Sequence, residues 1–289
     1  MFLEQLIAGL TVGTTYALLA LGYSMVFGVL SFINFAHGDV AMVGAYVCWF
    51  MFVEAGWGLG PAMVLAIAAG VVLGVLIEKI GYLPIRRASR LAAMLVSLGF
   101  SFVLATAVQI VFGTEPQHMP QAFEVTTFKV LNTAVSSLQI LILLFSLALM
   151  AALHLFVQKT RLGTALRATS LDKETAGLMG VDINGLISLT FAIGSGLAVV
   201  SAIMLGVYYG TVYPSMGGVI GMKGFTAVVL GGTGSIPGAM AGGILMGLLE
   251  SLGGAYISTR YANAIAFFVL ILTLLLRPAG LLGRTISKE

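Results

Sequence analysis

"GFTAVVLGGTGSIPGAMAGGILMGLL", residues 224–249, is apolar from end to end, yet its middle contains residues that break helices. The interrupting residues are Gly231, Gly232, Gly234 and Pro237. Glycine and proline interrupt a helix at membrane depth only where protein or water satisfies the freed backbone groups. The stretch therefore predicts a short half-helix, a break within 231–237 and then a fuller helix, with one kinked span as the alternative. Discontinuous helices of this kind often line substrate paths.

The composition of the 289-residue chain places such a stretch in a membrane. Hydrophobic residues make up 59% of the chain, charged residues make up only 9%, and the mean hydropathy is +1.07. A soluble domain of this length would be about 25% charged. We therefore expect an all-α fold, a polytopic transmembrane helical bundle of about eight or nine membrane elements, forming a single domain over residues 1–289.

Apolar runs alternate with polar loops, and the basic residues occupy only some of these loops. The runs lie at 5–29, 40–54, 61–77, 91–112, 136–157, 185–207, 224–249 and 261–276. Three regions hold most of the lysine and arginine: Lys79, Arg86, Arg87 and Arg90; Lys159, Arg161, Arg167 and Lys173; and Arg277, Arg284 and Lys288. By the positive-inside rule these regions are cytoplasmic, which predicts an external N-terminus and a cytoplasmic C-terminus.

The same rule supports the broken helix. An even number of crossings must separate the second basic region from the third, but only three apolar runs lie between them. Dividing the run at 224–249 into two elements restores an even number.

The sequence lacks the motifs of an enzyme. No glycine-rich stretch ends in Gly-Lys-Ser/Thr, so the chain has no phosphate-binding loop of its own. There is no HExxH motif or CxxC pair, and His37, His118 and His154 lie in different segments, so we expect neither a metal site nor a cofactor. Acidic residues are scarce within the apolar runs, and this argues that any transport is energised by another protein.

Residues 158–184, "QKTRLGTALRATSLDKETAGLMGVDIN", form the longest polar segment on the side expected to be cytoplasmic. Leu162 and Leu166 lie one helical turn apart, and Leu178 and Met179 add apolar side chains further along. The pattern favours two surface helices that dock on a partner protein. A solvated loop whose basic residues only fix the topology is the alternative.

A second polar interruption, "SFINFAHGDV" at residues 31–40, separates the first two apolar runs. We predict a break in which Gly38 permits a turn and Asp39 caps the next helix. Asn34 and His37 would satisfy freed backbone groups or form hydrogen bonds with a neighbouring helix. This structural role is favoured over a role in substrate binding.

Four stretches together resemble bacterial branched-chain amino-acid ABC transporter permeases of the LivH type. They are "GLTVGTTYALLALGYSMVFGVLSFINFAHGDVAMVGAY" (9–46), "RATSLDKETAGLMGVD" (167–182), "YYGTVYPSMGGVIGMKGFTAVVLGGTGSIPGAMAGGIL" (208–245) and "RPAGLLG" (277–283). The resemblance covers nearly the whole chain, and its "INFAHGD" and "GGTGSIPGA" signatures are the specific parts.

The resemblance implies the inner-membrane permease subunit of an importer, with a second related permease, two cytoplasmic ATPase subunits and a periplasmic substrate-binding protein as partners. Permeases of such importers contact the ATPase through a loop with Glu-Ala-Ala followed by Gly, which Glu174, Ala176 and Gly180 match, while Thr175 replaces the middle alanine. The implied ATPase-coupling residues are Arg161, Arg167, Asp172, Glu174, Ala176 and Gly180.

The resemblance leaves the substrate open. Branched-chain or related hydrophobic amino acids lead, but similar permeases carry urea, amides or other amino acids. A self-sufficient channel or secondary carrier is the rival from another class, and it leaves the amphipathic segment at 158–184 unexplained.

Overall fold

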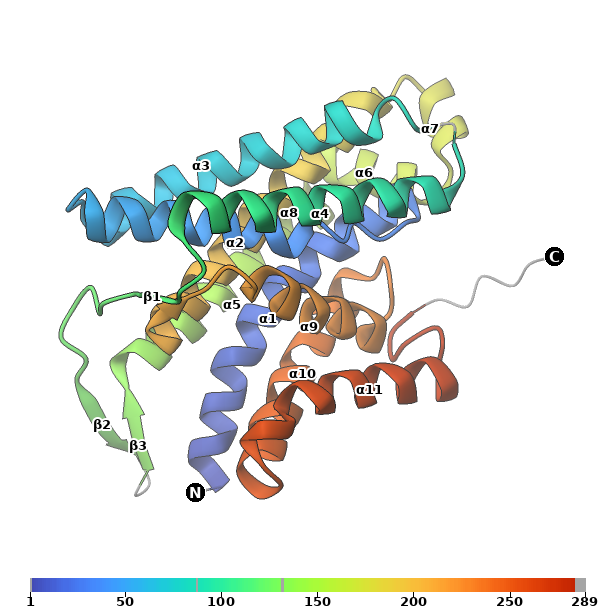
Figure 1. Ribbon diagram of the computed structural model, residues 1–289. Coiled ribbons are helices and arrows are strands. Elements are labelled where there is room, and N and C mark those ends of the chain that lie inside the picture. The colour runs from blue at the N-terminus through green and yellow to red at the C-terminus, as the bar shows by residue number, and fades with distance from the viewer. Residues whose placement is uncertain (1, 87, 131–132, 284–289) are drawn as a thin grey trace.

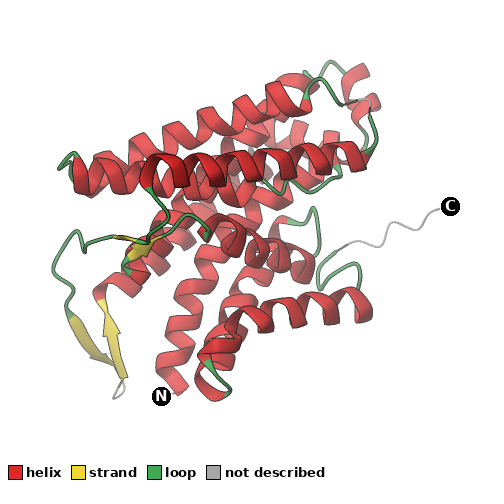
Figure 2. Cartoon of the chain, viewed as in Figure 1, coloured by secondary structure: helices red, strands yellow, loops and turns green. Residues whose placement is uncertain are grey.

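The computed structural model describes residues 2–86, 88–130 and 133–283. Within these residues the chain forms a bundle of eleven α-helices with two small antiparallel ribbons at its margin (Figures 1 and 2). The prediction of an all-α helical bundle is confirmed. Arg87, Arg284 and Lys288, which belong to the predicted basic regions, lie outside the described residues.

The helices have the following bounds: α1 Phe2–Leu30, α2 His37–Trp49, α3 Leu59–Ile77, α4 Arg90–Phe112, α5 Ser137–Lys159, α6 Arg161–Leu171, α7 Lys173–Leu178, α8 Ile183–Tyr209, α9 Met216–Gly231, α10 Ile236–Tyr256 and α11 Ala262–Leu276. Short helical turns follow or precede three of them: a π-helical turn Phe50–Glu54 after α2, another at Glu78–Tyr82 after α3, and a 3-10 turn Thr259–Tyr261 before α11. Strand β1 (Gln117–His118) pairs with β4 (Thr211–Val212), and β2 (Thr127–Val130) pairs with β3 (Thr133–Ser136).

Seven of these helical segments are long and apolar enough to cross a membrane: those containing α1, α3, α4, α5, α8, α10 and α11. Helix α9 is apolar but shorter, with 16 residues, and α2 has 13 residues. Counting both gives nine membrane elements among the described residues, within the eight or nine that the sequence predicts. The protein is therefore a multi-pass membrane protein.

Helices α1 and α8 form the centre of the bundle. In each, 78% of the apolar window is buried, compared with 17% in α4 and 11% in the α11 segment. Small residues let the central helices approach closely: a Cβ on Gly243 would lie 2.3 Å from the Cα of Ala17, and one on Gly247 would lie 2.3 Å from the Cα of Gly13. Such contacts supply the packing that holds helices together in lipid, where the hydrophobic effect does not act between them.

The outer helices expose apolar side chains along their length. Phe102 and Ile110 of α4 and Leu275 of α11 are each more than 70% exposed in the isolated chain. In a bilayer this surface is available to lipid or to a second membrane subunit.

The α3–α4 loop, helices α6 and α7 and the C-terminal end of α11, which carry the described residues of the three predicted basic regions, lie toward one end of the bundle (Figure 1). Helices α6 and α7 project from that end, whereas the β2–β3 hairpin lies at the other (Figure 1). The end of the described chain returns to the same place, because the backbone N–H of Leu281 donates to the carbonyl of Leu230 over 2.8 Å. Four helices, α8 to α11, separate the second region from the third, which is the even number that the charge pattern requires.

The predicted break in 224–249 is present but narrower than expected. Helix α9 ends at Gly231 and α10 begins at Ile236, so the break covers residues 232–235. Gly232 and Gly234 have φ values of 113° and 78°, which only glycine adopts readily. Pro237 does not interrupt a helix, since it lies in the first turn of α10, where proline is well tolerated.

The first piece of this broken region is also longer than the sequence suggested. It begins at Met216 instead of residue 224 and has 16 residues, because the polar Lys223 continues the helix. The expected half-helix is thus a nearly complete one.

The first break, after α1, departs from its predicted mechanism at two residues. Gly38 does not make the turn, because it lies in the first turn of α2, and Ser31 has the left-handed φ of 57°. Gly38 instead permits close packing, since a Cβ there would lie 2.2 Å from the Gly217 carbonyl oxygen. Asp39 does not cap α2; its Oδ2 accepts a hydrogen bond of 2.5 Å from Ser101 Oγ of α4.

Candidate functional site

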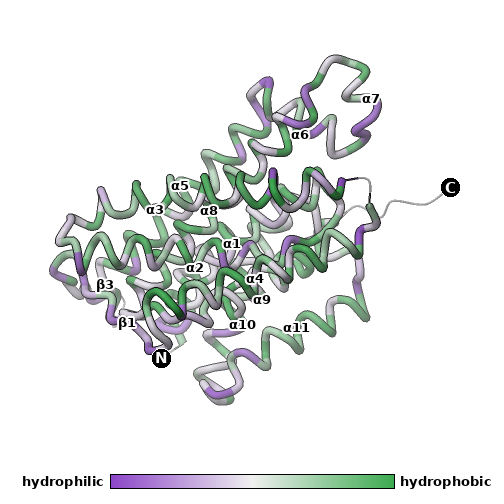
Figure 3. Tube along the Cα trace, turned by 45° about the horizontal axis from the view of Figure 1, so that its top comes forward, coloured by the Kyte–Doolittle hydropathy of each residue, from purple (hydrophilic) through white to green (hydrophobic). Residues whose placement is uncertain are grey.

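Helices α6 and α7, with the turn that follows them, lie in residues 158–184, which are called the coupling segment after the role that the sequence resemblance implies. The segment extends past the apolar bundle and carries most of the hydrophilic colour at that end (Figure 3). Thr160 caps α6 by accepting a hydrogen bond of 3.0 Å from the Gly163 N–H. Leu166 and Thr169 are buried toward the bundle, so α6 is anchored and is not a free loop.

Helix α7 is short and is held at both ends by specific residues. The Asp172 carboxylate accepts hydrogen bonds from the N–H groups of Glu174 (2.9 Å) and Thr175 (3.2 Å). Hydrogen bonds from the side chain and backbone of Thr175 lower the pKa of Asp172, so the cap is charged at neutral pH. After the helix, Gly180 turns the chain with φ 88°.

The outer surface of the coupling segment is unusually apolar for a polar end of the molecule. Leu171, Leu178 and Met179 are 81–88% exposed. Arg161, Arg167 and Glu174 of the same segment are also exposed, whereas Ala176 is buried. Large apolar side chains exposed on a charged segment are typical of a surface that binds another protein.

The loop between α3 and α4 lies against α7 at this end. Arg86, Arg90 and Lys173 line a common cavity of about 270 Å³. Burial lowers the pKa of Lys173, and the positive charges of Arg86 and Arg90 lower it further. The two basic loops thus form one electropositive surface.

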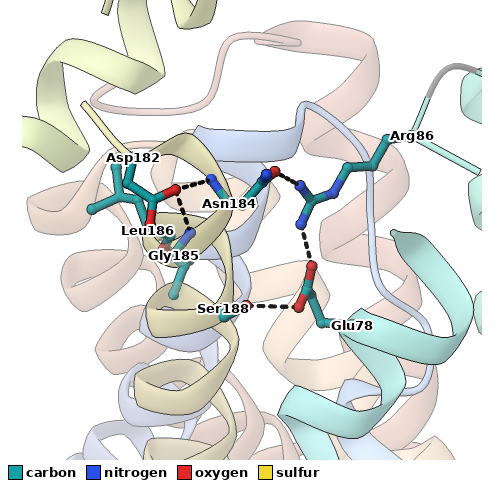
Figure 4. A network of polar contacts seen from close by, with 8 residues as sticks. Glu78, Arg86, Asp182, Asn184, Gly185, Leu186 and Ser188 are labelled. Atoms are coloured by element: carbon teal, nitrogen blue, oxygen red, sulfur yellow. Dashed lines mark hydrogen bonds and ion pairs between the residues drawn. The ribbon is translucent and has the colours of Figure 1, made fainter. Parts of the chain in front are cut away.

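A polar network ties the end of the coupling segment to the membrane helices (Figure 4). Arg86 pairs with the buried carboxylate of Glu78 and donates a hydrogen bond to the Asn184 side chain. The other Glu78 oxygen accepts a hydrogen bond of 2.8 Å from Ser188 of α8.

The start of α8 is capped within the same network. Asp182 accepts hydrogen bonds of 3.1 Å from the N–H groups of Asn184 and Gly185. The first turn of α8 is therefore joined both to the coupling segment that precedes it and to the end of α3.

A second constellation lies inside the bundle, at the middle of α1 and α9 and in the second half of α10. Lys223 of α9 and Glu250 of α10 form an ion pair with an Nζ–Oε1 distance of 2.7 Å, and their side chains are 10% and 12% exposed. The Lys223 ammonium also donates to the Tyr16 hydroxyl over 3.2 Å and lies 5.5 Å from the centre of that ring.

Three cavities meet at this ion pair. The largest, about 430 Å³, is lined by both charged residues and by Tyr16, Tyr209, Tyr213 and Asn263, among others. Glu250 also lines a cavity of about 370 Å³ beside α1, and Lys223 lines one of about 230 Å³ beside α11. The ion pair thus borders a cavity on more than one side.

Sequence reasoning missed this site. Glu250 directly follows the apolar run at 224–249, and Lys223 lies outside the three basic regions. A lysine between apolar stretches, away from the loops that carry the other cations, was the available signal, because ionisable groups at membrane depth are usually functional.

The residues of the first break do not join this site. Asn34, His37 and Asp39 are 2–4% exposed and none of them lines the three cavities. Asn34 Oδ1 accepts hydrogen bonds from the Ala36 N–H (3.1 Å) and the Tyr82 hydroxyl (2.9 Å), and the His37 ring packs on Tyr23 at 4.5 Å. In the described residues, no group of three His, Cys, Asp or Glu side chains could hold a metal ion.

Comparison with known proteins supplies the family. The model of the branched-chain amino acid transport system permease component matches residues 5–274. The chain belongs to this family. It is 40% identical to the high-affinity branched-chain amino acid transport system permease protein LivH of Escherichia coli and 41% identical to BraD of Pseudomonas aeruginosa, over 98% of this chain and 96% of each relative.

A solved structure has a similar fold. The structure of PsaBC from Streptococcus pneumoniae in complex with Fab matches with a TM-score of 0.54 and 14% identity, covering 96% of this chain and 93% of that chain. At this identity the likeness concerns the fold alone. The family assignment identifies the chain as a membrane permease component and not as an enzyme.

Proposed function

We propose that this chain is one of the membrane subunits of an ABC importer for branched-chain or related hydrophobic amino acids. Separate ATPase subunits would supply the energy, a second permease would complete the path, and a periplasmic binding protein would deliver the substrate. The observation that carries the proposal is the coupling segment, whose apolar patch Leu171, Leu178 and Met179 is exposed at the basic end of a membrane bundle of this family.

The proposed orientation follows from charge. The basic end, with Arg86, Arg90 and Lys173, would face the cytoplasm, and the end with the β2–β3 hairpin would face the periplasm. The chain would then begin outside the inner membrane and end inside it, and the coupling segment would meet the ATPase in the cytoplasm.

The polar network offers a way to transmit the ATPase motion. A displacement of α7 would pull on the start of α8, which is joined through Asn184, Arg86 and Glu78 to the end of α3. Because Glu78 is only 1% exposed, breaking its contacts would leave a buried charge unpaired. The two helices would therefore move together.

The choice of substrate rests on the relatives. LivH and BraD are named as branched-chain amino acid permeases. Urea, amides and other amino acids are the alternatives within the family, and uptake measured with the cognate binding protein would separate them.

The substitution Gly180→Arg tests the coupling segment. A Cβ at Gly180 has open space around it, so arginine would project from the surface into the ATPase interface. We expect leucine uptake and recovery of the ATPase with a tagged permease to fall by about tenfold or more, since overpacking a close interface costs about 1–3 kcal/mol. Membrane insertion should be retained.

Gly113→Arg is a closely matched control. Gly113 has nearly the same backbone, with φ 85°, and equally open surroundings, but it lies at the end of α4 opposite the coupling segment. Equal losses in both variants would attribute the effect to backbone strain and would remove the support for coupling at Gly180.

Reconstitution of the chain alone separates the importer from a self-sufficient carrier. We expect no ATP hydrolysis and no concentrative uptake in proteoliposomes, with or without a proton or sodium gradient. Uphill leucine uptake driven by such a gradient would show that the chain is a carrier in its own right.

A further inference from the structure

Lys223 and Glu250 form an ion pair that borders open cavities. The two side chains are therefore not needed to fill space between the helices. Burying two opposite charges in a membrane bundle carries a large desolvation penalty, which pairing offsets only in part. A buried pair of this kind is therefore a candidate functional site.

Both members of the pair have bonding capacity left. An ammonium has three donors, and the described contacts of Lys223 use two of them, on Glu250 and Tyr16. The Glu250 Oε2 atom is buried and has no hydrogen-bond partner among the described residues. One cation and one anion are thus placed side by side, each incompletely satisfied.

The surroundings suit a small amphiphilic molecule. The largest cavity, at about 430 Å³, falls within the range of about 300–1,000 Å³ typical of small-molecule sites. Apart from the charged pair, its wall combines aromatic residues with aliphatic ones such as Leu205 and Ile220. A ligand with two opposite charges and an apolar body matches this wall.

The position of the cavity in the bundle suits a substrate that enters from the periplasmic side. The cavity is formed by the middle of α1, the end of α8, the segment containing β4, and parts of α9, α10 and α11. The ends of α8 and β4 lie beside β1, at the end of the bundle opposite the coupling segment. In the proposed orientation this is the periplasmic half.

We propose that Lys223 and Glu250 bind the zwitterionic head of the transported amino acid. The α-carboxylate would bind the Lys223 ammonium, the α-ammonium would bind the Glu250 carboxylate, and the side chain would lie on the aromatic and aliphatic wall. This inference rests on the proposed function and names the substrate-contacting residues of that function.

Binding of a zwitterion at this ion pair is energetically feasible, because each charged side chain would exchange one oppositely charged partner for another. A zwitterion brings both charges, so it can separate Lys223 from Glu250 while giving each a new partner of the opposite sign. No buried charge is left uncompensated at any stage, and breaking the pair without this compensation would be strongly unfavourable. An uncharged solute such as urea could not make this exchange.

The first test neutralises each member in the full importer, with its ATPase, second permease and binding protein. We expect Lys223→Met and Glu250→Gln to lower leucine uptake about tenfold or more, since each removes a charge-assisted contact. Recovery of the ATPase subunits should be unchanged. Lys129→Met and Glu54→Gln are matched controls, because both residues are exposed and lie outside the cavities.

The exchanged pair, Lys223→Glu with Glu250→Lys, separates binding from structure. If the pair only stabilises the fold, the exchange should restore uptake. A binding site would keep its ion pair and its assembly but would present the two charges in the wrong order, so uptake should remain low. Full uptake in the exchanged variant, or in both neutral variants, would overturn the proposal.

Cysteine labelling tests binding without relying on transport. In a Cys48→Ser background, Asn263→Cys places a thiol on the cavity wall, and a polar thiol reagent should modify it. We expect L-leucine to slow the modification, urea to have no effect, and Lys223→Met to remove the protection by leucine.

The labelling assay keeps the two proposals distinguishable. If the intact importer takes up neither branched-chain nor related hydrophobic amino acids, the proposed function is wrong, but protection by other zwitterionic amino acids would still support the pair. If no zwitterionic amino acid protects the cysteine, the proposed pair is wrong even where leucine uptake is normal.

Discussion

The chain breaks its helical structure twice within the bundle, and the two breaks satisfy their backbones differently. After α1, a side chain supplies the missing contacts: Asn34 accepts from the Ala36 N–H and from the Tyr82 hydroxyl. Between α9 and α10, Ser235 Oγ accepts from the Gly238 N–H over 3.2 Å, but the last carbonyls of α9 are satisfied by the backbone of a distant segment. There, the N–H groups of Leu281 and Leu282 donate to the carbonyls of Leu230 and Gly231 over 2.8 and 2.9 Å.

The difference determines what each break tolerates. The first break depends on the side chain of Asn34 and on close helix contact at Gly38 beside it, whereas the second break depends on glycine at the break itself. A Cβ on Gly231 would lie 1.8 Å from the Gly238 carbonyl oxygen, and one on Gly232 would lie 2.4 Å from the Gly283 nitrogen. The substitutions below test this comparison.

We expect the largest effect from Gly38→Ala, beside the first break. Its Cβ would lie 2.2 Å from the Gly217 carbonyl oxygen and 2.7 Å from the Gly221 Cα. These are backbone atoms that cannot swing aside, so the loss should exceed the usual overpacking range of about 1–3 kcal/mol. The expected result is little or no folded protein on size-exclusion chromatography in detergent.

Gly99→Ala is the control for this effect. Gly99 also lies within a membrane helix, and a Cβ there would meet nothing within 4 Å. If both alanine variants are recovered folded in equal yield, close helix contact at Gly38 is not what the first break requires.

Gly38 also shows what the sequence alone could not predict. The sequence alone indicated a break near residue 38 and a glycine that mattered, but not that α9 lies against it. That contact depends on the crossing of two helices far apart in the chain. Local rules for glycine suggested a turn instead, and the turn formed at Ser31.

The same limit explains the missed ion pair. Lys223 and Glu250 are 27 residues apart, and Lys223 and Tyr16 are 207 residues apart, so no local spacing brings them together. By contrast, composition and the glycine cluster predict the bundle and the break near Gly231 from neighbouring residues alone. The apolar run lengths, however, did not show that α9 begins as early as Met216.

The second largest effect is expected from Asn34→Leu. Leucine would leave the Ala36 N–H and the Tyr82 hydroxyl without their partner in a buried site. The cost should be about 2–6 kcal/mol, since each of the two unsatisfied buried groups costs about 1–3 kcal/mol. Thermal unfolding in detergent would measure it.

Tyr82→Phe sharpens this measurement. It removes only the hydroxyl, leaves Asn34 bonded to Ala36, and should cost about 1 kcal/mol. An Asn34→Leu variant no less stable than Tyr82→Phe would mean that Asn34 does not satisfy the backbone of the first break.

A smaller effect is expected at the second break from Leu281→Pro. Proline has no N–H, so the Leu230 carbonyl would lose its donor, at a cost of about 1–3 kcal/mol. Leu281→Ala keeps the backbone bond and serves as the control, because the leucine side chain is 42% exposed. Equal melting temperatures for the two variants would show that this backbone contact does not stabilise the break.

The smallest effect should come from Ser31→Gly, where the two breaks differ most. The second break uses glycine for its left-handed residues, but the first places a serine at φ 57°. A left-handed conformation costs an ordinary residue about 1–2 kcal/mol, and glycine removes that cost. Glycine also loses more backbone entropy on folding, by about 0.5–1 kcal/mol, so the net gain should be below about 1 kcal/mol. Ser31→Gly keeps the N–H that donates to the Phe27 carbonyl over 2.8 Å, and Ser31→Ala keeps both that bond and the strain. The glycine variant should therefore melt slightly above the alanine variant, and a clearly lower melting temperature for Ser31→Gly than for Ser31→Ala would show that the left-handed strain at residue 31 is smaller than the entropy cost of glycine.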